Sequence, residues 1–232
     1  PGPGFYFDEA KGACSFELLA PLLTDCHLIA FDAAGHGFSG NRSADSGYNL
    51  WQDVGDVLDV ADELGWKRFS LLGHSRGAAI ATLFAGTFPD RVDNLLLIEG
   101  GLPILGPASD GPEGLAQSLT FARTRAGRSG RVFATREAAI AERVDGFSPV
   151  SHAAAEVLAG RSLREVAQGW QWHADQRLKG QSEIRFTQEL LTPFLDRISA
   201  RAVCVLAEES PFAGLDAYRQ LLPRIPGIEI AR

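Results

Sequence analysis

Apolar residues in the first hundred positions fall into two alternating patterns. Short apolar runs at residues 27–31, 69–72 and 95–98 have the length of buried strands. Residues 48–64 carry apolar side chains at helical spacing, and residues 75–88 are rich in small apolar side chains that also favour a helix. Because strands alternate with helices, this part of the chain predicts a parallel sheet with helices on each side.

The pattern changes after Gly100. A loop rich in glycine and proline runs to about residue 112, and residues 113–195 then show helical spacing without a strand. The expected elements are helices at 113–126, 136–143, 151–158 and 188–198, a strand at 202–206, a helix at 215–222 and a last strand at 227–230. This order predicts an α/β core made of residues 1–101 and 199–232, which is split by an α-helical cap at residues 102–198.

Composition and charge narrow the function classes. The 232 residues are 45% hydrophobic and 22% charged, which suits a globular domain of α/β size. The net charge of −7 disfavours a nucleic-acid or anionic membrane surface. No apolar run approaches the roughly 20 residues that span a bilayer. Cys14, Cys26 and Cys204 show no metal-ligand spacing, which favours reduced thiols and a cytoplasmic protein.

The sequence GHSRG at residues 73–77 is the main candidate for chemistry. It follows an apolar strand and precedes a helix of small residues, which is the context of a nucleophile elbow. The elbow lifts the Ser75 hydroxyl out of the chain, and its glycines allow two backbone segments to approach closely. No dinucleotide motif, phosphate-binding loop or metal cluster accompanies it, so no cofactor is expected.

Three segments together resemble the α/β-hydrolase superfamily with a helical cap. They are the strand and D-x-x-G-H-G-x-S turn at 27–39, LLGHSRG at 71–77, and FPDRV at 88–92 with the strand that ends in LLIEG at 96–100. Within the superfamily the chain looks most like the serine-hydrolase-like branch, because WQWHADQRL at 170–178 is similar to a cap segment of that branch. The resemblance implies a mostly parallel sheet with flanking helices, from which this chain is expected to lack terminal elements.

The resemblance also implies a catalytic triad in the chain order serine, acid, histidine. Ser75 is the expected nucleophile. The acid usually follows the strand after the cap, where this chain has Glu208 and Glu209 and has Ser210 in place of an aspartate. The alternative is Glu99 at the end of the preceding core strand, a position that some relatives use. Glu99 and Glu209 are equal candidates, with Glu208 behind them.

The expected base has no counterpart in this sequence. In the family it lies in a loop after the final strand, and that strand ends here at Arg232. The five histidines, His27, His36, His74, His152 and His173, all come earlier. We therefore expect the base to lie in a segment beyond Arg232, and residues 1–232 alone to hydrolyse esters poorly.

Two backbone N–H groups are expected to form the oxyanion hole. One belongs to Arg76, the residue after the nucleophile. In register with the family, Phe7 and Asp8 replace a His-Gly pair, so Phe7 is the candidate for the second donor. A carboxylate at Asp8 would be unfavourable near a developing negative charge.

The cap aromatics, Trp170 and Trp172 among them, are mostly expected in a core. Those that face the pocket would bind an apolar acyl or alcohol group, together with His74 beside the nucleophile. A cluster of arginines is expected to form a solvated basic face, with recognition of a substrate carboxylate as the alternative. The cluster consists of Arg123, Arg125, Arg128 and Arg131.

The sequence thus favours a serine hydrolase whose partner is a small acyl substrate. Ser75 would attack a carboxylic ester, and water would release the resulting acyl-enzyme. The alternative is a non-catalytic small-molecule binding protein with the α/β-hydrolase fold, which the absent histidine, Ser210 and Asp8 favour.

Overall fold

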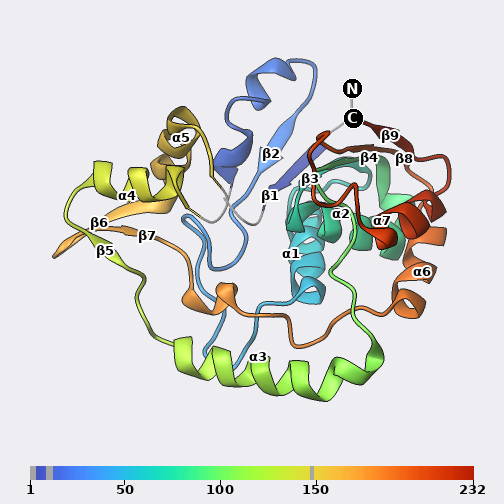
Figure 1. Cartoon of the computed structure of the whole chain (residues 1–232). Helices are drawn as coiled ribbons and strands as arrows, with labels where there is room; N and C mark the ends of the chain where they lie inside the picture. Colours follow the sequence, from blue (N-terminus) through green and yellow to red (C-terminus); the bar gives the residue numbers. More distant parts are fainter. Residues whose placement is uncertain (1–3, 9–12, 147–148) are drawn as a thin grey trace.

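The structure is a computed structural model that describes residues 4–8, 13–146 and 149–232 (Figure 1). Within these residues six strands form one sheet, and all neighbouring strands in it are parallel. The strands in spatial order are β2 (Leu28–Ala30), β1 (Gly4–Asp8), β3 (Phe69–His74), β4 (Val92–Ile98), β8 (Arg201–Val205) and β9 (Glu229–Ala231). The parallel sheet confirms the predicted fold class, although the sequence pattern did not predict β1.

Four helices contribute to the main core on one face of the sheet. They are α1 (Leu50–Glu63), α2 (Arg76–Thr87), α6 (Gln188–Asp196) and α7 (Asp216–Leu221). The side chain of Asn49 caps the start of α1 by accepting a hydrogen bond from the Gln52 N–H. Gly65, at a φ of +68°, follows the end of that helix as the sequence predicted. Among the helices of the described residues, none is both long and apolar enough to cross a membrane.

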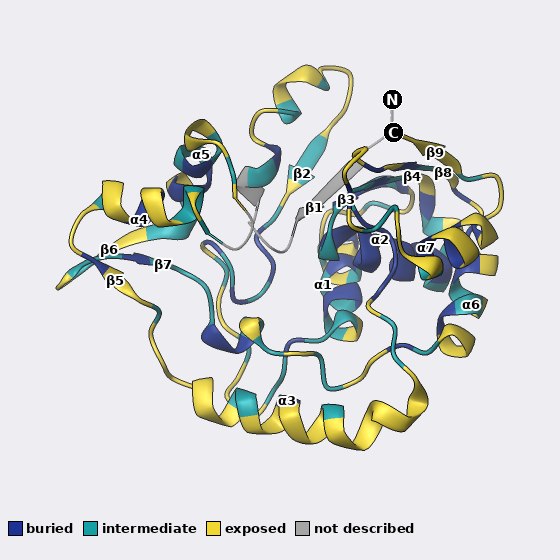
Figure 2. Ribbon diagram, in the orientation of Figure 1, coloured by how far each residue is buried: buried dark blue, intermediate teal, exposed yellow. Residues whose placement is uncertain are grey.

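The two faces of the sheet differ in how they are covered. Leu71, Leu95 and Leu97 point to one face and are buried in the main core with residues of all four helices (Figure 2). Leu72 and Leu96 point to the opposite face, where a smaller cluster forms around Phe16. The short 3₁₀ helices η1 (Ala13–Phe16) and η2 (Ala20–Leu22) lie in the segment between β1 and β2. The main core therefore lies on the face of the sheet that is covered by α2, the helix that follows the elbow.

The segment between β4 and α6 contains a second, smaller sheet. Helices α3 (Gly111–Arg125), α4 (Arg136–Val144) and α5 (His152–Ser162) are accompanied by three antiparallel strands, β5 (Val132–Phe133), β7 (Gly169–Trp172) and β6 (Leu163–Val166). The prediction that this segment lacks strands was wrong. The strands have two to four residues, which is too short for a period of two to stand out from the flanking helical pattern.

Helix α6 packs on α2, with Leu191 and Leu195 in the main core. The cap predicted from the sequence, residues 102–198, includes this helix. The division into 1–101, 102–198 and 199–232 stays a prediction, and the packing of α6 favours a cap that ends before Gln188.

A buried ion pair joins the cap to the core. Arg177 donates to Asp175 Oδ2 at 2.7 Å, and the Tyr48 hydroxyl donates to the same oxygen at 2.9 Å. Burial opposes ionisation of Asp175, but the hydrogen bonds from Arg177 and Tyr48 outweigh it and hold the pKa of the carboxyl below its usual value. The guanidinium of Arg177 also donates to three main-chain carbonyls, those of Arg42, Ser43 and Ser46.

A second ion pair reaches the turn after β2. Arg161, at the end of α5, donates to Asp32 Oδ2 at 2.8 Å, and the Phe38 N–H donates to the same oxygen at 3.0 Å. A Cβ added at Gly37, whose φ is +48°, would lie 2.2 Å from that oxygen. The D-x-x-G-H-G-x-S turn therefore wraps a buried carboxylate that also binds the cap.

Candidate active site

Ser75 occupies a strained turn between β3 and α2. Its φ of +52° and ψ of −119° are rare for a residue with a Cβ. The conformation is held by the main chain: the Ser75 N–H donates to the Ile98 carbonyl at 3.0 Å, and its own carbonyl accepts from the Ala78 N–H at 3.1 Å. The structure thus has the strand, sharp turn and helix that the motif predicted.

Glycines allow the close approach of chains around this turn. A Cβ added at Gly73 would lie 2.4 Å from the Gly77 carbonyl oxygen, and one added at Gly100 would lie 2.6 Å from the Ser75 carbonyl oxygen. Real Cβ atoms do not come so close to backbone, so a side chain at either position would push the turn out of place.

Ser75 lines a cavity of about 450 Å³. Its walls are mainly apolar and come from residues 102–104 after β4, from residues 178–186 before α6, and from Phe212 and Tyr218 near α7. The polar groups at its edge include Ser182, Arg76 and Arg185. A cavity of this size and composition suits a small ligand that is largely apolar.

A buried ion network fixes the first residue of α2 against α1. Arg76 Nη2 lies 2.7 Å from Asp53 Oδ2, and Arg42 Nη2 lies 3.0 Å from Asp53 Oδ1 and 2.6 Å from Asp56 Oδ2. The Asp53 side chain is 1% exposed, and burial raises its pKa to about 7, although the Arg42 guanidinium favours the charged form. Burial lowers the pKa of Arg76 to about 10, which leaves it cationic at neutral pH. The network thereby holds the backbone N–H of Arg76 at the start of the helix.

Glu99 is the candidate acid that lies nearest the elbow. It follows β4 directly, has a φ of +48°, and accepts a hydrogen bond from the Ala207 N–H at 2.7 Å. Its neighbour Gly100 packs against the backbone of Ser75. Glu208 and Glu209 are both exposed, whereas Glu99 is half-buried. The geometry therefore favours Glu99 as the acid, and neither Glu99 nor Glu209 lines the cavity itself.

Comparison with known proteins identifies the family. The family model described as the alpha/beta hydrolase fold matches residues 10–224. The chain belongs to the α/β-hydrolase family. Its parallel sheet with flanking helices and its elbow agree with this membership.

Two of the curated proteins that match this α/β hydrolase are named serine hydrolase-like proteins. It is 29% identical to the serine hydrolase-like protein of Danio rerio, over 88% of this chain and 64% of that protein. It is 32% identical to serine hydrolase-like protein 2 of Homo sapiens, over 90% of this chain and 68% of that protein. The chain thus spans about two thirds of the length of these curated relatives.

Solved structures agree with the fold. The crystal structure of a hypothetical protein from Pseudomonas aeruginosa PAO1 matches with a TM-score of 0.90 and 38% identity, over 99% of this chain and 81% of that one. A thioesterase domain from the curacin biosynthetic pathway matches with a TM-score of 0.85 over 100% of this chain and 83% of that one. Its 19% identity shows the fold alone. Together the comparisons support a hydrolase at the general level.

In this α/β hydrolase none of the five histidines, all of which lie in the described part of the chain, lines the Ser75 cavity. His27 packs edge-on against Trp66, and His36 forms a bridge to Ala174 at the cap. His173 lines a different cavity, and His152 begins α5. The histidine base of the predicted triad therefore has no counterpart among the described residues that line the Ser75 cavity.

The second oxyanion donor stays a prediction. Phe7 lies in β1 opposite Gly73, and Asp8 lies opposite His74, so the carboxyl end of β1 is beside the strand that leads into the elbow. The loop that follows, residues 9–12, lies outside the described residues. The Arg76 N–H, by contrast, stands at the first position of α2, where the helix dipole favours negative charge.

The structure does not bring the three predicted substrate-binding residues to the Ser75 cavity. His74 ends β3 without lining it, and Trp170 and Trp172 lie on β7 in the small sheet. The Trp172 indole N–H donates to the Ala139 carbonyl at 3.2 Å and ties that sheet to α4. Pairing with β5 and β6 holds β7 within the small sheet, and this is why its aromatic residues do not reach Ser75.

Sequence reasoning missed the residues that form the cavity and support the elbow. The cavity segment at 178–186 has no regular apolar period, so no pattern distinguished it from a loop. Asp53 did carry a signal, because it falls on the apolar stripe of its helix between Leu50 and Val57. A charged residue on a buried helix face needs a partner, and Arg76 supplies it.

Proposed function

We propose that this protein is a serine hydrolase that acts on a carboxylic ester or a related acyl substrate through Ser75. The observation that carries the proposal is the strained elbow of Ser75 at the edge of a mainly apolar cavity. Strain of this kind is retained where the surrounding structure holds it, and it is concentrated at functional sites.

In the proposed reaction the Ser75 Oγ attacks the substrate carbonyl and gives up its proton to a base. The negative charge that develops on the carbonyl oxygen is stabilised by the Arg76 N–H at the positive end of α2. The alcohol leaves with a proton, and an acyl group remains on Ser75. Water then attacks the acyl-enzyme, releases the acid and restores the hydroxyl. Glu99 is the proposed group that orients the base.

The first prediction tests the nucleophile. In a form of the protein that hydrolyses p-nitrophenyl esters, a fluorophosphonate probe should add at Ser75, as seen by intact mass and peptide mapping, and Ser75→Ala should abolish the addition. Ser182→Ala is the matched control, because Ser182 is a second hydroxyl that lines the same cavity. Labelling that survives in Ser75→Ala, or that disappears in Ser182→Ala, would overturn the assignment.

A second candidate function is a non-catalytic small-molecule binding protein. It is favoured by one observation: no histidine of the described chain lines the Ser75 cavity. Binding of a p-nitrophenyl ester that saturates without release of p-nitrophenol, together with absence of probe labelling, would support this alternative. Turnover that depends on Ser75 would exclude it.

A further inference from the structure

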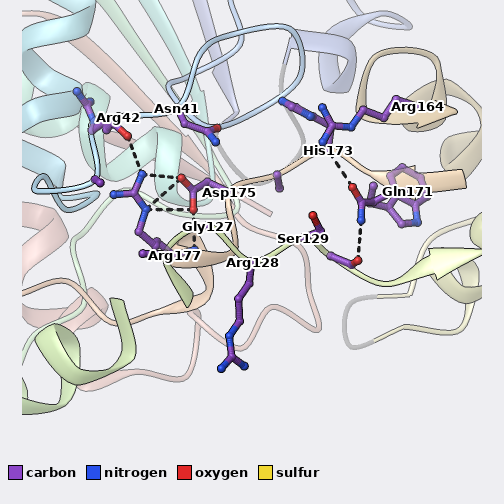
Figure 3. Close-up of a pocket in the computed structure, with 15 residues that line it drawn as sticks. Asn41, Arg42, Gly127, Arg128, Ser129, Arg164, Gln171, His173, Asp175 and Arg177 are labelled. Atoms are coloured by element: carbon purple, nitrogen blue, oxygen red, sulfur yellow. Dashed lines mark hydrogen bonds and ion pairs between the residues drawn. The ribbon is translucent and has the colours of Figure 1, made fainter. Parts of the chain in front are cut away.

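A second cavity, of about 290 Å³, lies where the loop at residues 41–44 meets the small sheet (Figure 3). Its walls come from the loop at residues 41–44, from the segment 126–130 after α3, and from the small sheet with the residues that follow it. None of its lining residues lines the Ser75 cavity. Its ionisable side chains are four arginines, one histidine and one carboxylate, namely Arg42, Arg128, Arg164, Arg177, His173 and Asp175.

Two of the arginines are already neutralised. Arg177 forms the buried pair with Asp175, at 2.7 Å. Arg42 pairs with Asp53 and Asp56, at 3.0 and 2.6 Å. These contacts hold the wall in place, and they neutralise Asp175, the one carboxylate among the described residues of the lining.

Positive charge remains on the other side of the cavity at Arg164, and the titratable imidazole of His173 lies on the same side (Figure 3). Arg164 is exposed on β6 and donates only a long hydrogen bond, 3.4 Å, to the neutral Oε1 of Gln171. Within the described residues no carboxylate lies within ion-pair distance of it. Burial and then the charge of Arg164 lower the pKa of His173, so the two groups are close enough to repel each other when both are charged. Arg128 extends away from the other labelled side chains in Figure 3.

We propose that this cavity binds the phosphate group of a small phosphorylated molecule, with Arg164 and His173 as its cationic contacts. A bound anion would pair with the Arg164 guanidinium and would favour protonation of His173. The guanidinium and imidazolium together match a phosphate dianion better than a single carboxylate. The Ser129 hydroxyl also lines the cavity and supplies a further donor. The volume exceeds what a bare phosphate needs, and Trp172 offers an apolar wall for the rest of the molecule.

A hydrogen bond connects the linings of the two cavities. Tyr48 lines the Ser75 cavity, and its hydroxyl donates to Asp175, which lines the second cavity. The proposal nevertheless rests on the charges of the second cavity alone and does not depend on the chemistry of Ser75.

Histidine NMR on the 232-residue chain tests the proposal. Titration with phenyl phosphate should shift the His173 imidazole signals to saturation and raise the pKa of His173, because a bound anion stabilises the imidazolium. Inorganic phosphate should bind to the same residue more weakly, because it leaves the apolar wall empty. Binding of inorganic phosphate as tight as that of phenyl phosphate would indicate a site for the free ion and would overturn the phosphorylated-molecule assignment.

Variants make the test specific. Arg164→Gln should weaken phenyl phosphate about tenfold, as expected for loss of one charge-assisted contact. Arg123→Gln removes the same charge from the exposed face of α3 and should leave the affinity within about twofold. Equal losses of phenyl phosphate affinity in both variants would indicate a general effect of net charge and would overturn the proposed site. Benzoate binding as tightly as phenyl phosphate would overturn the phosphate assignment.

Discussion

Ser75 and Glu99 are the two non-glycine residues of the described chain that have a positive φ. The two residues are linked through the neighbours of Glu99. The Ser75 N–H donates to the carbonyl of Ile98, the residue before Glu99, and Gly100, the residue after it, contacts the Ser75 backbone. The Glu99 N–H donates in turn to the Val205 carbonyl of β8 at 2.9 Å. Two costly conformations at one edge of the sheet indicate a single constrained site that both residues serve.

Substitution of Glu99 tests its role as the acid. In a form of the protein that hydrolyses p-nitrophenyl esters, Glu99→Gln should lower kcat by about two to four orders of magnitude, because the base loses the charge that orients it. The thermal midpoint should change little, because the glutamine carbonyl can still accept the hydrogen bond from the Ala207 N–H.

Glu209→Gln is the matched control at the residue scale. Glu209 is exposed, so its neutralisation should leave kcat within about twofold. The opposite result, normal kcat in Glu99→Gln and a large loss in Glu209→Gln, would show that the acid is Glu209, in the turn after β8.

At the scale of elements, the close packing of β3 against α2 depends on glycine at position 73, where there is no room for a side chain. Gly73→Ala would place a Cβ 2.4 Å from the Gly77 carbonyl oxygen, which is backbone and cannot rotate away. We expect Gly73→Ala to lower the free energy of unfolding by roughly 1–3 kcal/mol, in the range of other overpacking substitutions, and to slow probe labelling at Ser75. Urea denaturation and labelling kinetics measure the two effects.

Gly55→Ala is the opposite case and serves as the control. A Cβ at Gly55, inside α1, has no heavy atom within 4 Å. Alanine there should raise stability by roughly 0.5–1 kcal/mol, because glycine is a poor helix former. Similar destabilisation by both substitutions would show that the close approach at Gly73 is not the cause.

The elements of the core could be predicted from the sequence, and the small sheet could not. α1, α2 and β4 lie within a few residues of their expected bounds, because each has enough residues to show its period. β5, β6 and β7 are defined by pairing with each other across the cap. Gly169 shows this dependence: a Cβ there would lie 2.1 Å from the Phe133 carbonyl oxygen, a contact that only the tertiary structure reveals.

At the scale of the whole molecule, the candidate site also combines a part that is local in the sequence with parts that are not. Ser75 was predictable because the elbow is a local motif. The cavity walls come from segments more than a hundred residues apart, such as Leu50 and Phe186, and no local pattern links them. Arg177 was equally hidden, because its partners in the loop at residues 42–46 are main-chain carbonyls, which have no signature in the sequence.

Substitution of Arg177 therefore tests how the cap is held on the core. Arg177→Gln would leave the buried carboxylate of Asp175 without its cation and three carbonyls without their donor. We expect a loss of about 3–5 kcal/mol, the cost of breaking a buried ion pair by removing one partner. The loss of stability should be confined to the junction between cap and core, where Arg177 contacts residues 42–46. Amide exchange should therefore accelerate in β6 and β7 and stay slow in β3 and β4.

Acid should weaken the junction in the wild-type protein as well. The pKa of Asp175 is lower in the folded state than the unfolded value near 4, so its contribution to stability is fully present above about pH 4. That contribution is lost as the pH falls through the folded-state pKa, where the carboxylate is protonated. Lys179→Gln removes an exposed charge from the same short segment and should leave both the amide exchange and its acid dependence unchanged. Faster exchange throughout the main sheet in Arg177→Gln would contradict a local junction and show that cap and core unfold as one unit.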